Sequence, residues 1–197
     1  SIVLEAVTMA DRCGMSVQMS VAGSRDGDSV IWAYGGAAKR TNKTLPNIAW
    51  ELDPRGTAAL LSRGFVAEDC AKNTVDIHDG RFVLHPPAYD PSEKIPMHTV
   101  AGRCSGGEMF VADAVLWKEP HKLVKAENPK QPLVCGTMPL KRGENSLYWA
   151  VEAYADDKPG DASRLQDPAG TFRKSIERVD AVVRQVVVDT PEPTLNA

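Results

Sequence analysis

Cys104 lies in the stretch of this sequence that comes nearest to a nucleophile motif. The five residues from Gly102 to Gly106 (Gly-Arg-Cys-Ser-Gly) have the outline of a nucleophile elbow with cysteine as the nucleophile. Such an elbow needs a strand before it and a helix after it, so that the nucleophile stands exposed at a helix N-terminus. Residues 109–111 follow with β character instead, and no histidine and acid partners follow in a recognisable context. The pattern therefore predicts a glycine-rich hairpin turn and no catalytic residue.

The histidines raise the question of a cupin-like metal site. Such a site needs His-x-His on one strand, because alternate residues of a strand point the same way. The sequence contains no such pair. His78 and His85 flank Asp79-Gly80 and could approach each other, yet a third ligand is not evident. We expect no metal site, with these two histidines and His98 and His121 at the surface or in supporting positions.

The cysteines and a short basic loop complete the search for reactive groups. The four cysteines form no Cys-x-x-Cys pair, which argues against a zinc ribbon or a thioredoxin-type redox site. Their even number allows one or two disulfides, whereas buried thiols that pack as small hydrophobes are the more frequent arrangement. Residues 35–41 (Gly-Gly-Ala-Ala-Lys-Arg-Thr) hint at a phosphate loop but lack the Walker spacing and the helix start that would hold the anion. We expect no cofactor.

Aromatic side chains are the remaining candidates for binding, because their faces pack against the CH groups of sugar rings. Trp32 and Tyr34 share strand parity and would project from one face, and Trp50 lies near a predicted strand edge. We take these three as candidate carbohydrate-binding residues, with core packing as the alternative explanation for each. A pair of catalytic carboxylates about 5–10 Å apart cannot be identified among the 26 acidic residues.

Composition excludes several classes of partner. The net charge is −3 over 197 residues, and Lys and Arg are scattered, which argues against a nucleic-acid or anionic-membrane surface. No apolar run approaches about 18 residues, so we expect no membrane span. There is no basic-then-apolar leader, and an opening at Ser1 is consistent with processing, trimming or excision from a larger protein.

The elements that must position these residues are mostly strands. Short apolar stretches alternate with turn residues over the first 150 positions, which is typical of an antiparallel β protein. Residues 2–7, 15–21 and 30–34 look like a three-stranded meander. In the second of these, Met15, Val17, Met19 and Val21 fall at period two, which predicts one buried face, with the intervening serines and glutamine on a solvent-exposed face.

A hairpin and several later strands follow. Asp79-Gly80 separates residues 74–77 from 81–85 and predicts a type I′ turn, which needs positive φ at both positions. Further strands are expected at 99–101, 109–117, 133–135 and 147–154, and exposed loops at 86–96 and 118–132, with 47–52 as a less regular candidate strand before a turn at 53–56.

The pattern changes after residue 155. Asp167-Pro168 resembles a helix N-cap with proline at the first helical position. Phe172, Ile176, Val179 and Val183 follow on one helical face, and charged residues cover the other. The sequence thus predicts a β-sandwich domain over 1–155, followed by a C-terminal amphipathic linker helix and the start of a further domain over 156–197.

The last twelve residues carry a resemblance to a known superfamily. Residues 186–197 (Val-Val-Val-Asp-Thr-Pro-Glu-Pro-Thr-Leu-Asn-Ala) resemble a junction in six-hairpin glycosidase-like proteins. There, a β-sandwich called a supersandwich precedes a linker helix, and a phrase Thr-Pro-Asp/Glu-Pro-x-Leu-Asn opens an (α/α)6 barrel. Residues 32–36 and the stretch 53–73 also look like sandwich parts of an uncharacterised bacterial family in that superfamily, whose members are associated with polysaccharide breakdown.

This resemblance implies that catalysis and support belong to different domains of one protein. The catalytic carboxylates would come from the helical barrel of the same protein, so this chain would be the non-catalytic module of a secreted or periplasmic glycoside hydrolase. A strip of exposed apolar surface should then mark the missing neighbour. Two alternatives stay open: a free-standing carbohydrate-binding module, and a small independent enzyme built around Cys104 or the histidines.

Overall fold

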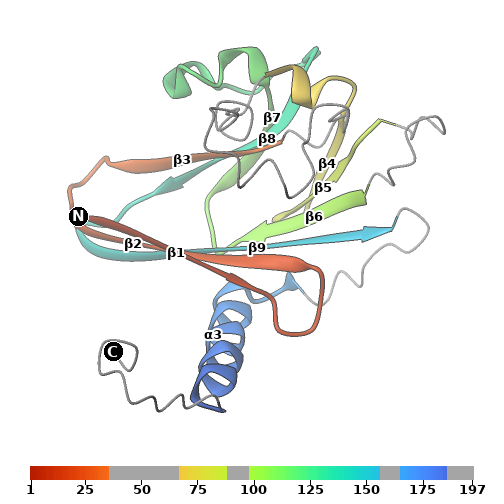
Figure 1. Ribbon diagram of the computed structural model, residues 1–197. Helices are drawn as coiled ribbons and strands as arrows, with labels where there is room; N and C mark the ends of the chain where they lie inside the picture. The colour runs from red at the N-terminus through yellow and green to blue at the C-terminus, as the bar shows by residue number, and fades with distance from the viewer. Residues whose placement is uncertain (36–66, 88–97, 156–164, 186–197) are drawn as a thin grey trace, which may run out of the picture.

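The computed structural model describes residues 1–35, 67–87, 98–155 and 165–185. Two antiparallel β-sheets lie face to face, and one helix packs against the outside of the larger sheet (Figure 1). The chain is therefore mainly β, a sandwich followed by a helix, as the sequence predicts. Within the described ranges, no helix is both long and apolar enough to cross a membrane.

The larger sheet has six strands in the order β1-β2-β9-β6-β5-β4. Its longest strand, β9, pairs with β2 on one side and with β6 on the other, so strands far apart in sequence meet along it. The strand bounds are β1 Ile2–Thr8, β2 Gly14–Ser24, β4 Thr74–His78, β5 Arg81–His85, β6 His98–Cys104 and β9 Gly143–Ala155.

The smaller sheet has three strands in the order β3-β8-β7, with bounds β3 Ser29–Tyr34, β7 Glu108–Asp113 and β8 Pro132–Pro139. The expected meander of the first three strands is therefore wrong. β1 and β2 do pair, but β3 crosses to the opposite sheet and pairs with β8, where its alternate side chains enter the shared core. Short 3₁₀ helices lie beside the smaller sheet: η2 Ala67–Cys70, η4 Ala114–Leu116 and η5 Pro120–Lys122.

Two connections between strands can be compared with the turns that the sequence predicts. Asp79 and Gly80 both have positive φ, at 50° and 70°, which confirms the type I′ hairpin between β4 and β5. The turn after Cys104 joins β6 of one sheet to β7 of the other, so the predicted hairpin there is wrong. β7 is also shorter than its predicted 109–117, because the Asp113 side chain accepts the Val115 N–H and starts η4.

The core between the sheets is built from aromatic and branched side chains. Trp32 packs against Phe82 and, edge-on, against Trp149, with ring centroids 6.1 and 6.3 Å apart. Two glycines leave room for these rings: a Cβ on Gly102 would lie 2.2 Å from the Phe82 ring, and one on Gly136 would lie 2.5 Å from the Trp32 indole. Each ring thus lies over a glycine of the neighbouring strand in its own sheet, where a side chain is missing.

Helix α3, Pro168–Gln185, covers the outer face of the large sheet, where it contacts β9, β2 and β1. Asp167 caps it by accepting the Gly170 N–H at 2.9 Å, which confirms the predicted start. The face assignment for β2 is wrong in two places: Ser16 is fully buried on the face that α3 covers, and Met15 on the opposite face is 44% exposed. Both faces of β2 meet other elements, so polarity alone does not indicate burial.

Candidate functional site

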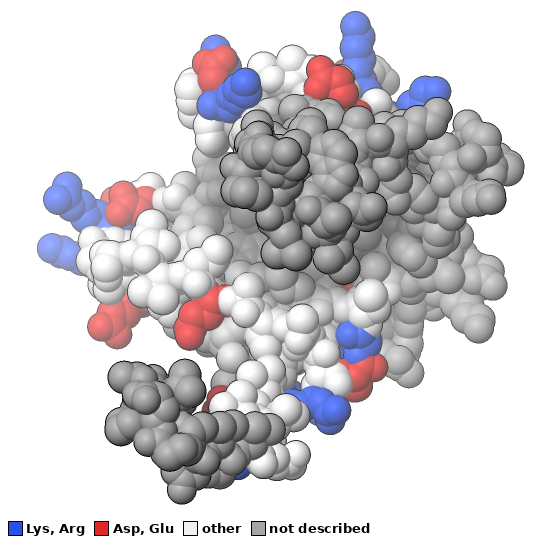
Figure 2. All heavy atoms as spheres, viewed as in Figure 1, with Lys and Arg blue, Asp and Glu red and all other residues white. Residues whose placement is uncertain are grey.

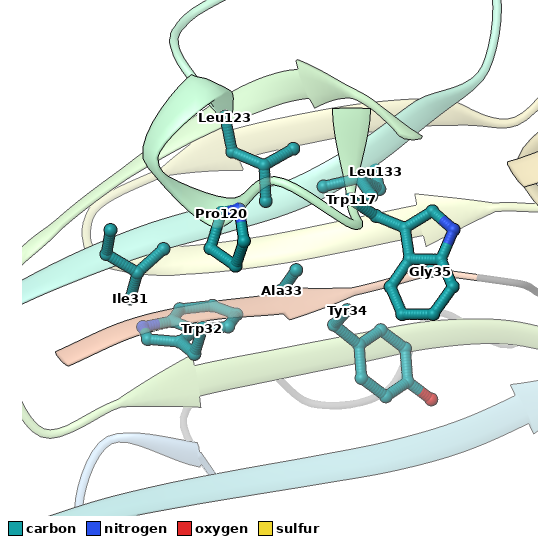
Figure 3. A pocket seen from close by; sticks show the side chains of 9 residues that line it. All are labelled: Ile31, Trp32, Ala33, Tyr34, Gly35, Trp117, Pro120, Leu123 and Leu133. Carbon is teal, nitrogen blue, oxygen red and sulfur yellow. The ribbon is translucent and has the colours of Figure 1, made fainter. Parts of the chain in front are cut away.

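An apolar pocket opens on the outer face of the small sheet, beside β3 (Figure 3). Its volume is about 390 Å³, within the usual range for small-molecule sites. Alternate residues of β3 face it, and the segment that carries η4 and η5 forms the opposite wall. The side chains that form its walls are Ile31, Ala33, Trp117, Pro120, Leu123 and Leu133.

The segment from η4 to Leu123 is held in place by a buried cluster. Leu123 and Leu133 pack with the thiols of Cys70 and Cys135, all nearly inaccessible to solvent. Leu123 was expected in an exposed loop, but its side chain anchors that loop to the sheet. Trp117 remains half-buried at the rim of the pocket, with the Lys118 ammonium 6.0 Å from its ring centroid.

Trp32 and Tyr34 share one face of β3, as their parity predicts, but that face is the inner one. In Figure 3 both rings lie on the opposite side of β3 from Leu123 and Pro120. The Tyr34 ring packs at a tilt against Phe82, with ring centroids 5.6 Å apart, and burial raises the pKa of its phenol. Core packing accounts for the position of both residues. Trp50 lies outside the described residues, and sugar binding by the three stays a prediction.

Trp117 is the aromatic that sequence reasoning passed over. It falls at the end of the predicted strand 109–117, and nothing local distinguishes it from a core tryptophan. Its exposure arises from η4, which ends β7 early and turns the chain outward. The available signal was Asp113, a residue type that caps short helical turns.

The histidines do not converge. His78 pairs with Arg81 beside the turn, whereas His85 pairs with Thr74 at the far end of the hairpin, so the expected approach of the two is wrong. Each imidazole lies near a different carboxylate, His78 beside Asp79 at 2.9 Å and His85 beside Asp76 at 3.4 Å. Within the described part of the chain, no three His, Cys, Asp or Glu side chains are grouped so as to hold a metal ion.

The thiols are poorly placed for nucleophilic chemistry. Cys70, Cys104 and Cys135 are buried while Cys13 is exposed, so the buried-thiol alternative is correct for three of the four cysteines. Cys104 donates from Sγ to the Gly106 carbonyl at 3.1 Å, and burial raises its pKa. Burial also raises the pKa of Cys135 to about 11. Because the thiolate is the nucleophile, a raised pKa lowers the reactive fraction of both groups at neutral pH.

A second apolar surface lies on the C-terminal half of α3. Val179, Val182 and Val183, here called the valine stripe, are 40%, 52% and 64% exposed. They border a groove of about 240 Å³ whose other wall is the loop from Thr8 to Ala10. The N-terminal half of the same helix is anchored by Phe172, so α3 is packed at one end and uncovered by described residues at the other.

Charged side chains are dispersed over the face of the molecule seen in Figure 2, with no basic patch on its described surface. This agrees with the scattered charge of the sequence. No family model matches the chain, and no curated protein matches it.

Proposed function

We propose that this chain is the non-catalytic β-sandwich module of a glycoside-hydrolase-like protein, and that the valine stripe packs on a helical domain of the same protein. The observation that carries the proposal is the exposed stripe itself. The apolar side chains on the buried face of α3 continue into the stripe without interruption, from Phe172 through Ile176 to Val179. The side-chain pattern thus provides an apolar face longer than the sheet that covers it.

A helix suits this surface as a partner. Val182 and Val183 follow Val179 by three and four residues. Side chains at these spacings form the ridge that packs into the groove of a neighbouring helix. The groove beside Met9 would accept one large apolar side chain from such a helix. The resemblance of residues 186–197 to the junction before an (α/α)6 barrel supports the same partner. Under this proposal the barrel contributes the catalytic carboxylates.

The first test is the native reading frame beyond the codon for Ala197. Several hundred codons of paired amphipathic helices are expected, and a stop codon at that point would contradict the proposal. The second test uses the longer protein. Val182→Lys should separate the melting of the sandwich from that of the helical domain, because a lysine ammonium would be buried at their contact.

Val124→Lys is the matched control, because Val124 is 63% exposed on a loop far from α3 in sequence. It should leave the melting of the longer protein unchanged. In the chain of 197 residues, both substitutions should change the free energy of unfolding by less than about 0.5 kcal/mol, because both side chains already face solvent. Equal melting of the two variants of the longer protein would refute docking through the stripe.

A free-standing carbohydrate-binding module is the second candidate, and the pocket of Figure 3 favours it, because Trp117 at its rim offers an aromatic surface. Titration calorimetry of the chain against a panel of soluble polysaccharides is the test. Binding that Trp117→Ala abolishes and Val124→Lys preserves would establish this function. The absence of binding is the result that the first proposal expects.

A further inference from the structure

The two sheets of the sandwich differ in width, and the difference leaves a strand-shaped recess. The six-stranded sheet ends in β1, whereas the three-stranded sheet ends in β3 within the described residues. Trp32 of β3 packs over Val17 and Trp149, that is, over β2 and β9. β1 therefore extends beyond β3, and its inner face carries Leu4 at 61% exposure.

The recess has an apolar floor and an apolar wall. Its volume is about 260 Å³. The inner face of β1 and β2 forms the floor, and the edge of β3 with the aromatic core forms the wall. The floor residues are Leu4, Met15, Val17 and Met19, and the wall residues include Trp32, Ala33 and Tyr34. None of these seven residues carries a charge. Glu5, the charged residue of β1, has the opposite parity and lies on the outer face.

Among the described residues, the β1 edge that borders the recess lacks much of the protection that free edges usually carry. β1 is seven residues long, pairs with β2 without a bulge, and contains no lysine or proline. At the other end of the same sheet, β4 has five residues, of which the exposed ones are Thr74, Asp76 and His78. Short length and outward polar side chains are how proteins block edge pairing. β4 has both, whereas β1 is longer and its inner face carries no charge, with Glu5 on the outer face as its charged residue.

We propose that the recess receives β1 of a second copy of this chain, in a two-fold dimer joined edge to edge. In one molecule, β1 extends beyond the β3 edge of the small sheet, and the recess lies where the small sheet has no strand above β1. The projecting β1 and the recess therefore have about the same width and are complementary in shape. A two-fold axis along the strands places β1 of each copy beside β3 of its partner. It also packs the inner faces of the two β1–β2 ribbons on each other. In an alternative dimer, β1 of one copy would pair with β1 of the other to form one continuous sheet. That arrangement would leave both recesses empty, so we reject it.

The contact is large enough for a stable dimer. Strands rise about 3.4 Å per residue and lie about 4.8 Å apart, and packed sheets are about 10 Å apart. With these dimensions, the β1 edge, the β3 edge and the floor have a combined footprint of roughly 650 Å² per copy. Standard interfaces bury about 800 Å² per partner. The surface is uncharged and continuous with the core of each sandwich, as in the central part of homodimer interfaces.

Sedimentation equilibrium of the 197-residue chain, from low to high micromolar concentration, tests the dimer. The wild-type chain should dimerise. Leu4→Lys should raise the dimer dissociation constant by about a hundredfold, because two ammonium groups would be buried per dimer. Val124→Lys and Val183→Lys, at 63% and 64% exposure, are matched to Leu4 and should dimerise as wild type does. Val183 also separates this contact from the proposed domain contact on α3.

Amide hydrogen exchange locates the contact. In the wild-type chain, the outward amides of β1 and of Ile31 to Tyr34 should become protected as concentration rises, and in Leu4→Lys they should not. A wild-type chain that stays monomeric overturns the proposal. Edge amides of β3 that are protected equally at every concentration also overturn it, because another part of the same chain then covers the edge. Loss of the dimer in Val183→Lys alone would assign it to α3 and refute the recess.

Discussion

Gly136 is where the packing of the two sheets can be tested most directly. A Cβ at this position would lie 2.5 Å from Cε2 and Nε1 of Trp32 and 2.6 Å from Cζ2, so the indole lies flat on the backbone of β8. Phe82 and Trp149 flank the indole, and its open side faces the recess that Leu4 and Met15 also line. Gly136→Ala must therefore displace the ring by about 1 Å or more to restore van der Waals contact.

We expect Gly136→Ala to lower the free energy of unfolding by about 2–3 kcal/mol, the upper part of the range for overpacked cores. Removal of strained aromatic contacts adds to the loss, whereas the lower backbone entropy of alanine in the unfolded chain opposes it by less than about 1 kcal/mol. Urea denaturation, followed by tryptophan fluorescence and circular dichroism, measures the change. Gly106→Ala is the control, because a Cβ there meets no atom within 4 Å.

The reasoning fails if Gly136→Ala and Gly106→Ala have the same stability. A double-mutant cycle gives a sharper test: in a Trp32→Phe background the smaller ring leaves space, so Gly136→Ala should cost less there than in the wild-type chain. An additive cycle would show that the alanine acts on something other than the indole.

Three further changes have measurable consequences. Asp167→Ala removes the acceptor of the Gly170 N–H at 2.9 Å and should cost about 1 kcal/mol in thermal denaturation. Arg12→Met leaves the 6% exposed Glu152 without the guanidinium 3.2 Å away. We expect a loss of about 3 kcal/mol in urea denaturation, most of it restored by adding Glu152→Gln. Burial raises the pKa of Cys135 from 9.0 to about 11, so the stability held below pH 9.0 should fall as the pH rises toward 11, and less steeply in Cys135→Ala.

Local chemistry predicted the elements that local chemistry determines. Asp79-Gly80 fixes its own turn, because few residue pairs adopt positive φ twice in succession. The start of α3 was predicted equally well, since Asp167 and the following proline act within one turn of the chain. These features need no knowledge of distant residues.

Pairing partners and burial depend on the whole chain, and there the sequence misled. Ser16 is buried because α3, more than 150 residues later, covers its face. β3 leaves the predicted meander because β8 provides a better-placed edge and a glycine for Trp32. At the candidate pocket, the sequence correctly predicts that Trp32 and Tyr34 share one face of β3. Whether that face lies inward or outward depends on the position of the opposite sheet. Trp117 was missed for a local reason, because the Asp113 cap starts η4 and ends β7 before the tryptophan.

The central position of β9 has a consequence for the order of synthesis. Gly14 of β2 pairs with Glu152, and Ser29 of β3 pairs with Pro139, so β2 lacks its second partner strand and β3 lacks β8 until most of the chain exists. At about 5–20 residues per second on the ribosome, β2 waits roughly 10–30 s for β9. Through that interval the first hairpin exposes Val7 and Val21, which are buried in the folded protein. The domain therefore closes late, from its C-terminal strands inward, and its earliest segment is the one most in need of protection.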